Sequence, residues 1–382
     1  MEVCTPFMEV NQAIVAMGGN DLNSCMQCGM CTGTCPWRMV GGEFNVRKMI
    51  RMGQLGLEGF ESTDVLYGCT TCNYCVLRCP RGVKIIDVMR SMRSMIAEAG
   101  TIPPALKTVS GSIFSNGNPW SEAREKRLEW IKEANVPIFS GGTEYFLSIC
   151  CTSAYDIRSQ KIARSLATIL NKAGESFGVI GNEESCCGES LRKIGDEAQF
   201  EALAQKNINL LIDKGVKKII VTSPHCYYTY TKEYPQFGAE FEVIHHTQLL
   251  AELIRSGAVT FSGKLEQAVT YHDPCYLGRH SDVYDDPRSI ILALPGVQFM
   301  EMSRNRQNSL CCGAGGGRLW METPPEWRFS DIRLNEALSN GAQVLATACP
   351  YCISMLEDSR KTLNQDQAIV IKDVAELVAE AL

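Results

Sequence analysis

The chain has 382 residues, 45% of them hydrophobic and 21% charged, which is long enough for two or three domains with cores of their own. Its net charge of −6 does not favour a nucleic-acid-binding surface. The first twenty residues show no basic leader, and no apolar run approaches the ~20 residues that cross a bilayer. We therefore expect a cytoplasmic protein that reaches a membrane only through a partner. Its 19 cysteines are expected to bind metal rather than form disulfides.

The N-terminal cysteines form two motifs with the same spacing. Each motif is Cys-x2-Cys-x2-Cys-x3-Cys followed by proline. In such runs the first three cysteines hold one 4Fe–4S cube, and the fourth usually serves the other cluster. Zinc is the alternative, but zinc sites use two CxxC pairs with a long spacer. The sequence therefore predicts two cubane clusters, one on Cys25, Cys28, Cys31 and Cys79 and the other on Cys69, Cys72, Cys75 and Cys35.

The segment between the two motifs, residues 37–68, has the pattern of helices, which favours a helical ferredoxin domain over residues 1–100. Residues 101–142 are rich in proline and glycine turns around one charged helical run at 121–135. We interpret them as a linker that packs on the surface.

The remainder of the chain is an internal repeat, with copies predicted at 143–262 and 263–382. Its cysteines recur 124 to 126 residues later, and a glycine follows the cysteine pair in both copies. Four buried strands are expected in each copy, at 144–149, 176–180, 217–222 and 241–244 and at 264–271, 297–302, 343–348 and 368–371. Helical segments such as 157–174 and 196–215 separate them. The alternation predicts two pseudo-symmetric α/β repeats with parallel sheets, and thus an α+β multidomain protein.

Most repeat cysteines directly follow predicted strands. Cys151, Cys226, Cys275 and Cys349 are in this position. Because the carboxyl ends of parallel strands meet at one edge of a sheet, we expect these thiols to converge. The alternative is that they are small buried hydrophobic side chains, which does not explain their position in both copies.

The second copy carries five cysteines in the pattern Cys…Cys-Cys-Gly…Cys-Pro-x-Cys, which is one thiolate more than a cubane can use. The set is Cys275, Cys311, Cys312, Cys349 and Cys352.

Two ferredoxin motifs followed by two Cys-Cys-Gly repeats resemble the heterodisulfide reductase iron–sulfur subunit family, over about residues 23–352. The family also includes the iron–sulfur subunit of anaerobic glycerol-3-phosphate dehydrogenase. The resemblance implies that the five cysteines of the second repeat hold a noncubane 4Fe–4S cluster, which can cleave a disulfide or pass electrons. It also implies other redox subunits as partners, such as a flavoprotein, an iron–sulfur protein or a membrane cytochrome.

The first repeat departs from this pattern at one position. Ser223 stands where the second repeat has Cys349. The remaining candidates for a further cluster are Cys151, Cys186, Cys187 and Cys226, with Cys150 as a substitute ligand or a bystander. His225 is a weaker candidate, because a loop histidine is more often a hydrogen-bonding group.

Several other residues are ambiguous. The glycines at 313 and 315–317 lack a nucleotide-binding fingerprint and would instead let backbone amides approach cluster sulfurs. We expect cap or core roles for the two histidines at 245 and 246. His272 and Asp273 are expected to tune the cluster, deliver protons or cap the loop, and Arg318 to bind an anion or a carboxylate. Cys4 is expected to be a free thiol.

Two classes of function follow. The first is a redox subunit that moves electrons between the cubanes and the noncubane cluster, coupled to a quinone-linked dehydrogenase, a flavin-based bifurcating module or an acyl-CoA reductase. The second is an assembly scaffold with structural clusters. Reduction by dithionite would separate the two.

Overall fold

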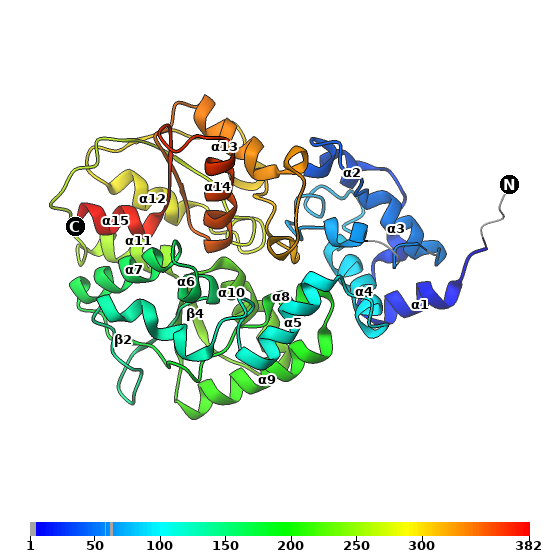
Figure 1. The fold of residues 1–382 in the computed structure, drawn as a ribbon, viewed down its shortest axis with the longest axis horizontal. Helices are drawn as coiled ribbons and strands as arrows, with labels where there is room; N and C mark the ends of the chain where they lie inside the picture. Colours follow the sequence, from blue (N-terminus) through cyan, green and yellow to red (C-terminus); the bar gives the residue numbers. More distant parts are fainter. Residues whose placement is uncertain (1–4, 58, 62–63) are drawn as a thin grey trace. The chain divides into compact units, whose positions relative to one another are not determined.

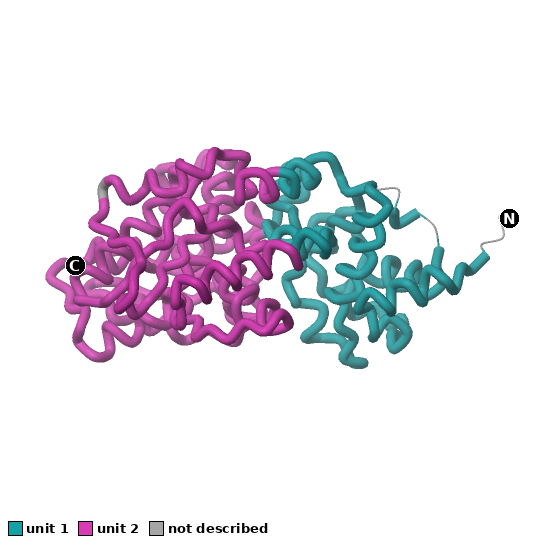
Figure 2. The backbone as a smooth tube through the Cα atoms, turned by 90° about the horizontal axis from the view of Figure 1, so that it is seen from below, with its two compact units in different colours: residues 1–111, 190–200, 313–329 teal, residues 112–189, 201–312, 330–382 magenta. Residues whose placement is uncertain are grey.

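The computed structural model describes residues 5–57, 59–61 and 64–382 and divides into two compact units (Figure 2). Unit 1 contains residues 1–111, 190–200 and 313–329, and unit 2 contains residues 112–189, 201–312 and 330–382. Cys4 lies outside the described residues.

Unit 1 is built from helices, as the sequence predicted. Helix α3 shows how local residues set a helix. The side chain of Asn45, just before the helix, caps its first turn by accepting from the Lys48 N–H at 3.0 Å, and the helix ends at Gly56, whose backbone is left-handed. The helices are α1 (Met8–Ala16), α2 (Met30–Thr34), α3 (Val46–Leu55), α4 (Ile85–Glu98) and most of α5 (Pro104–Asn116), with 3₁₀ turns at Leu22–Ser24, Pro36–Arg38, Asp64–Gly68, Arg318–Trp320 and Pro325–Trp327.

The segments that follow the two Cys-Cys-Gly motifs belong to unit 1, together with the ferredoxin region. The first carries most of α8 (Glu189–Ile194) and the start of α9 (Glu197–Asp213). In the second, Trp327 and Phe329 pack edge-on against Trp37, with ring centroids 6.0 and 5.1 Å away. Parts of the chain that are far apart in sequence therefore share one apolar core.

The segment expected to be a linker, 101–142, forms helix α5 and a 3₁₀ helix at Arg124–Glu133. Arg127 and Trp130 of this 3₁₀ helix are 2% and 1% exposed, so the segment contributes buried side chains to unit 2.

Unit 2 contains two parallel four-stranded sheets, and all eight predicted strands are present. Figure 1 labels the two edge strands of the first sheet, β2 and β4. The strand orders are β2-β1-β3-β4 and β6-β5-β7-β8, so the two repeats have the same topology. The strands are β1 (Tyr145–Ser148), β2 (Phe177–Gly178), β3 (Lys218–Val221), β4 (Glu242–His245), β5 (Ala268–Tyr271), β6 (Gln298–Phe299), β7 (Val344–Thr347) and β8 (Val370–Asp373).

The two repeats share one hydrophobic core. Helix α7 of the first repeat packs on α15 of the second, and α11 of the first packs on α12 of the second. One continuous cluster of buried residues contains side chains from both sheets and from these four helices. The helices of unit 2 are α6 (Cys151–Tyr155), α7 (Gln160–Ala173), most of α9 (Glu197–Asp213), α10 (Pro224–Tyr228), α11 (His246–Ser256), α12 (Asp285–Ala293), α13 (Phe329–Ser339), α14 (Pro350–Thr362) and α15 (Val374–Ala381). A π-helical turn and a 3₁₀ turn span Thr229–Glu233 and Tyr234–Phe237. Among the described residues, no helix is long and apolar enough to cross a bilayer.

Candidate iron–sulfur sites

The first ferredoxin site gathers three cysteines of the first motif and the last cysteine of the second. Cys25, Cys28, Cys31 and Cys79 line one pocket in unit 1, beside Pro80. The pocket therefore brings together the four cysteines that the spacing assigns to one cluster, and their role as its ligands stays a prediction.

The second ferredoxin site is the reciprocal arrangement around Cys75. Burial raises the pKa of Cys75 well above its usual value, and the nearby thiolates of Cys72, Cys69 and Cys35 raise it further. A group of thiols whose charges repel one another in this way is stabilised when a cation binds them, because the metal neutralises the thiolates.

Both ferredoxin loops share an unusual backbone. Gln27 and Thr71, at the same position in the two motifs, have φ of +61° and +51°, and Gly29 and Asn73 have φ of +86° and +66°. Non-glycine residues avoid this left-handed region, at a cost of about 1–3 kcal/mol each. Alternation of left- and right-handed residues turns successive N–H groups toward one centre, where they can bind an anionic cluster.

The loop of the second motif is held in place by one buried cation. Arg93 on α4 is fully buried, and its guanidinium donates to the backbone oxygens of Leu66 and Cys69 at 3.0 and 2.7 Å. It also donates to Lys193 O and Gly316 O at 2.7 and 3.0 Å, which lie in the segments that follow the two Cys-Cys-Gly motifs.

The glycines after the second cysteine pair allow a close backbone approach within unit 1. A Cβ on Gly315 would lie 2.3 Å from Thr70 O, and one on Gly316 would lie 2.2 Å from Cys69 O. Any side chain at these positions would displace the loop of the second ferredoxin motif.

The first-repeat site lies at the carboxyl ends of β1 and β3. Its four predicted cysteines line one small pocket together with Cys150 and Ser223. The sulfurs of Cys187 and Cys226 lie 3.5 Å apart. A hydrogen bond from Cys186 and the charge of Arg127 lower the pKa of Cys151, although burial opposes them.

A buried ion pair borders the first-repeat site. Arg127 lies 2.5 Å from Glu184 Oε1 and points Nη1 at Cys151 Sγ, 3.6 Å away. Cys150 caps α6, where its sulfur accepts from Ser153 N–H at 3.4 Å, and burial raises its pKa to about 12. The serine that replaces cysteine, Ser223, caps α10 by accepting from the His225 N–H at 3.3 Å.

The second-repeat site forms at the carboxyl ends of β5 and β7. The sulfurs of Cys312 and Cys352 lie 3.3 Å apart, which repeats the Cys187–Cys226 pair of the first site. An imidazole nitrogen of His272 lies within 4.8 Å of both sulfurs. All five predicted cysteines, Cys275, Cys311, Cys312, Cys349 and Cys352, are buried.

His225 belongs to the first repeat but forms a hydrogen bond with Cys349 of the second repeat. Its Nδ1 lies 2.9 Å from Glu189 Oε1, and its ring stacks on Tyr276 at 4.2 Å. Burial lowers the pKa of His225, but the charge of Glu189 and a hydrogen bond with Cys349 raise it to about 10. Burial likewise raises the pKa of Cys349, but hydrogen bonds from Cys352 and His225 lower it to about 5.

The remaining ambiguous residues have structural partners. His245 caps α11, and His246 is buried and hydrogen bonded to Asp373 at 3.0 Å. Asp273 pairs with Arg288 at 2.7 Å. The guanidinium of Arg318 lies over the Trp37 ring and donates to the Thr323 hydroxyl.

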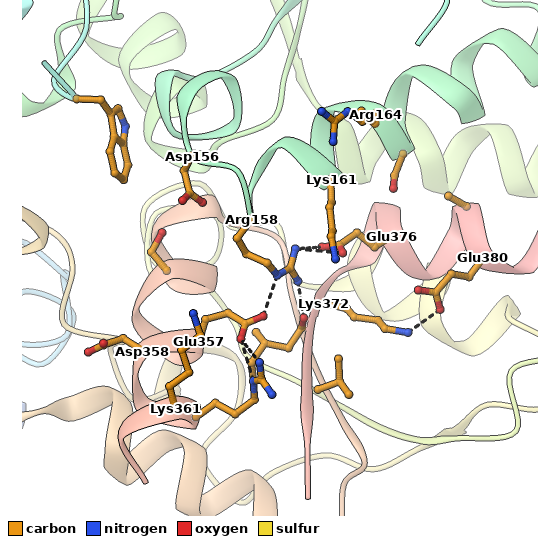
Figure 3. Close-up of a pocket in the computed structure, with 17 residues that line it drawn as sticks. Asp156, Arg158, Lys161, Arg164, Glu357, Asp358, Lys361, Lys372, Glu376 and Glu380 are labelled. Atoms are coloured by element: carbon orange, nitrogen blue, oxygen red, sulfur yellow. Dashed lines mark hydrogen bonds and ion pairs between the residues drawn. The ribbon is translucent and has the colours of Figure 1, made fainter. Parts of the chain in front are cut away.

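A charged groove of about 740 Å³ opens in unit 2 between α7, β8, α14 and α15 (Figure 3). Arg158 crosses it and donates to Glu357 and Glu376 at 2.8 and 2.9 Å. No cysteine is among the described residues that line it. The groove is therefore an ion-pair network that joins the two repeats, apart from the sulfur chemistry.

The donor sets fit iron–sulfur clusters. Each group consists of soft thiolates, which suit iron–sulfur clusters, and the left-handed residues of the ferredoxin loops are of the kind that turns N–H groups toward an anion. In the second repeat, His272 in addition has a buried Nε2 without a hydrogen-bond partner among the described residues, and one of its ring nitrogens lies within 4.8 Å of two of the sulfurs. Sequence reasoning missed Arg93, Arg127 and Glu184, because single arginines and glutamates carry no pattern that distinguishes them from surface charges.

Comparison with protein families finds two kinds of domain in this chain. Residues 21–83 match the 4Fe–4S dicluster domain, and residues 145–230 and 269–357 each match the cysteine-rich domain called CCG.

Several relatives are redox proteins. The chain is 39% identical to the probable iron–sulfur-binding oxidoreductase FadF of Bacillus subtilis, over 84% of this chain and 47% of that protein. It is 31% identical to the EtfAB:quinone oxidoreductase of Syntrophomonas wolfei, over 95% of this chain and 58% of that protein. It thus spans about half the length of these two relatives.

A third relative matches over nearly its whole length. The chain is 32% identical to one subunit of the dihydromethanophenazine:CoB–CoM heterodisulfide reductase of Methanosarcina barkeri, over 95% of this chain and 94% of that relative.

Proposed function

This chain belongs to the heterodisulfide reductase iron–sulfur subunit family, and from that premise we propose that it is the electron-transferring iron–sulfur subunit of an oxidoreductase complex. The observation that carries the proposal is the pocket in unit 1 that Cys79 lines together with the first three cysteines of the first motif. Two clusters whose ligand sets interlock in this way are held at a fixed separation, which suits the passage of single electrons from one to the other.

The ligands follow from the four groups of thiols. In unit 1, Cys25, Cys28, Cys31 and Cys79 would hold one cubane and Cys69, Cys72, Cys75 and Cys35 the other. In unit 2, the five cysteines of the second repeat would hold a noncubane 4Fe–4S cluster. When bound, such clusters supply one-electron redox chemistry at low or intermediate potential.

The surrounding residues exclude water and balance charge. Burial of the thiols of unit 2 keeps solvent away from them, so that neighbouring charges act strongly. Arg127 places a positive charge beside Cys151, and His225 donates toward Cys349. Both cations favour the thiolate form that iron requires.

The second repeat is the one we assign to terminal chemistry, because its thiol set is complete. Reduction of a disulfide takes two electrons and two protons and gives two thiols, and soft sulfur is a good ligand for iron. In the first repeat, Ser223 is occupied as a helix cap and offers an oxygen that binds iron less readily than thiolate does. We assign this repeat a four-thiol site that relays electrons.

The partner is a further redox protein. One relative is named for EtfAB:quinone oxidoreduction and another for heterodisulfide reduction, so a flavoprotein or a quinone-linked protein is the class we propose.

Anaerobic purification with its partners tests the proposal. We expect a brown protein with roughly 12 to 16 iron atoms per chain, from three or four clusters of four, whose absorbance bleaches with dithionite. Stoichiometric zinc would contradict the cluster assignment. Full iron content without any reduction by dithionite would favour the assembly scaffold instead.

A further inference from the structure

His272 lies in the second repeat immediately after β5, and its ring is buried against Arg333 of α13. Arg333 Nε donates to His272 Nδ1 at 3.1 Å. The two residues are 1% and 0% exposed, so water does not compete for this bond.

The contacts of Arg333 determine whether His272 Nδ1 donates or accepts a hydrogen bond. Arg333 Nη1 donates to Glu336 Oε2 and Arg304 O, both at 2.8 Å, which fixes the plane of the guanidinium. A guanidinium has only donors and stays protonated in proteins. His272 Nδ1 must therefore be the acceptor, without a proton of its own.

A neutral imidazole carries one proton, so the proton of His272 is on Nε2. Nε2 is buried and has no hydrogen-bond partner among the described residues. A buried N–H without a partner is destabilising, which indicates that something outside the chain accepts from it. The sulfurs of Cys312 and Cys352 mark where that acceptor lies, since an imidazole nitrogen is within 4.8 Å of both.

We infer that His272 is a hydrogen-bond donor, not an iron ligand, and that its Nε2–H binds a sulfur of the cluster in the second repeat. Arg333 is the positioning residue that sets the tautomer. A protonated Nε2 has no lone pair for iron, which excludes ligation in this arrangement. The inference rests on the proposed function, because it needs a cluster on Cys312 and Cys352.

The hydrogen bond should shift the reduction potential of the second-repeat cluster in one direction. Reduction adds negative charge to the cluster, and a donor at sulfur stabilises the more negative state. The bond therefore raises the reduction potential of this cluster. Counting back from the aligned cysteines Cys275 and Cys151, the residue of the first repeat that corresponds to His272 is Ser148, whose hydroxyl donates to Glu184 at 3.2 Å instead. The donor is therefore particular to the second repeat.

The test uses two amides in the anaerobic, iron-loaded full chain. The His272→Asn amide oxygen can still accept from Arg333, but its side chain is too short to reach the sulfurs. The His272→Gln amide nitrogen can take the place of Nε2. We expect His272→Asn to lower the midpoint potential of the second-repeat cluster in an EPR-monitored titration, and His272→Gln to recover much of the loss. Both variants should keep wild-type iron content and unchanged potentials of the two cubanes.

A second readout identifies the bond directly. In wild type, electron–nuclear double resonance should show a strongly coupled proton on the second-repeat cluster that exchanges in D₂O and is absent from His272→Asn. The control is His245→Asn, another buried histidine, which should leave both readouts unchanged.

Three results would overturn the inference. One is an unchanged potential in His272→Asn with full iron, and another is directly bonded nitrogen coupling of a histidine ligand in wild type. The third is the loss of about four iron atoms in both His272 variants, since ligation would then be essential. By contrast, an iron content of Cys312→Ala equal to that of the wild type would contradict the proposed function itself, because no cluster would then occupy the second repeat.

Discussion

Replacing Arg93 by methionine should destabilise unit 1 more than any surface change on the same helix. The guanidinium is fully buried and makes four hydrogen bonds to backbone oxygens from three separate segments of the chain. Methionine is of similar length and fills much of the space, so the lost hydrogen bonds dominate the effect.

The magnitude follows from the hydrogen bonds and the burial of the charge. Hydrogen bonds from a charged donor contribute about 1.5–3 kcal/mol each, which bounds the four at about 6–12 kcal/mol. Removing the charge also removes its desolvation penalty of several kcal/mol, so we expect a net loss of about 3–5 kcal/mol. The free energy of unfolding of a domain is about 5–15 kcal/mol, so unit 1 should remain folded but with a much smaller free energy of unfolding.

The assay is anaerobic guanidinium denaturation followed by the visible absorbance of the clusters, with EPR to separate the two cubanes. Because Arg93 binds Leu66 O and Cys69 O, the cubane on Cys69, Cys72, Cys75 and Cys35 should be released first. The control is Arg90→Met, on the same helix, where the arginine is 21% exposed and makes only a 3.9 Å ion pair. Its effect should stay below about 1 kcal/mol.

Arg93→Lys gives a further check, since an ammonium has three donors and should recover part of the stability. Equal denaturation midpoints for Arg93→Met and Arg90→Met would refute the reasoning. So would simultaneous release of both cubanes in Arg93→Met.

Four other predictions concern the clusters and one buried histidine. Cys72→Ala should lose about four iron atoms and one cubane signal while the unit 2 signals persist, as iron analysis and EPR would show. Cys312→Ala should abolish activity with the natural acceptor while dithionite still reduces the cubanes; retained turnover would contradict the assignment of terminal chemistry. Ser223→Cys should gain a second noncubane signal, and two identical signals already present in wild type would refute the asymmetry of the repeats. Burial holds the pKa of His245 well below its usual 6.5, so the unfolded state binds more protons and stability falls as the pH drops below about 6.5. His245→Asn, which can keep the helix cap, should reduce this slope by up to about 1.4 kcal/mol per pH unit in denaturant titrations from pH 7 to 5.

Much of the fold could be predicted from local patterns. The eight strands and the helices between them follow from hydrophobic periodicity, because burial of an apolar face decides secondary structure over a few residues. The position of Cys151, Cys226, Cys275 and Cys349 after strands was also confirmed, since each lies within a few residues of the end of its strand. The family prediction is confirmed too, because it rests on the spacing of seventeen motif cysteines.

The boundaries of the two compact units could not be predicted from local sequence patterns. The segments 190–200 and 313–329 follow repeat motifs in sequence, yet they belong to the compact unit that contains the ferredoxin loops. The glycines and aromatic residues of these segments do not reveal that the segments belong to unit 1. A close approach such as that of Gly316 to Cys69 O joins residues that are far apart in the chain, and no local pattern records it.

The sequence by itself determined the kinds of sites this protein has, because thiolate spacing is a local property: three cysteines within seven residues must curl around one centre wherever the loop lies in the fold. Only the tertiary structure decided what surrounds those thiolates. The Arg127–Glu184 pair at Cys151, His225 beside Cys349 and the tautomer of His272 each depend on side chains that meet across loops or repeats. Hydrogen bonds and charges act over a few ångströms of space regardless of separation along the chain, so these contacts exist only once the two repeats have packed on their shared core.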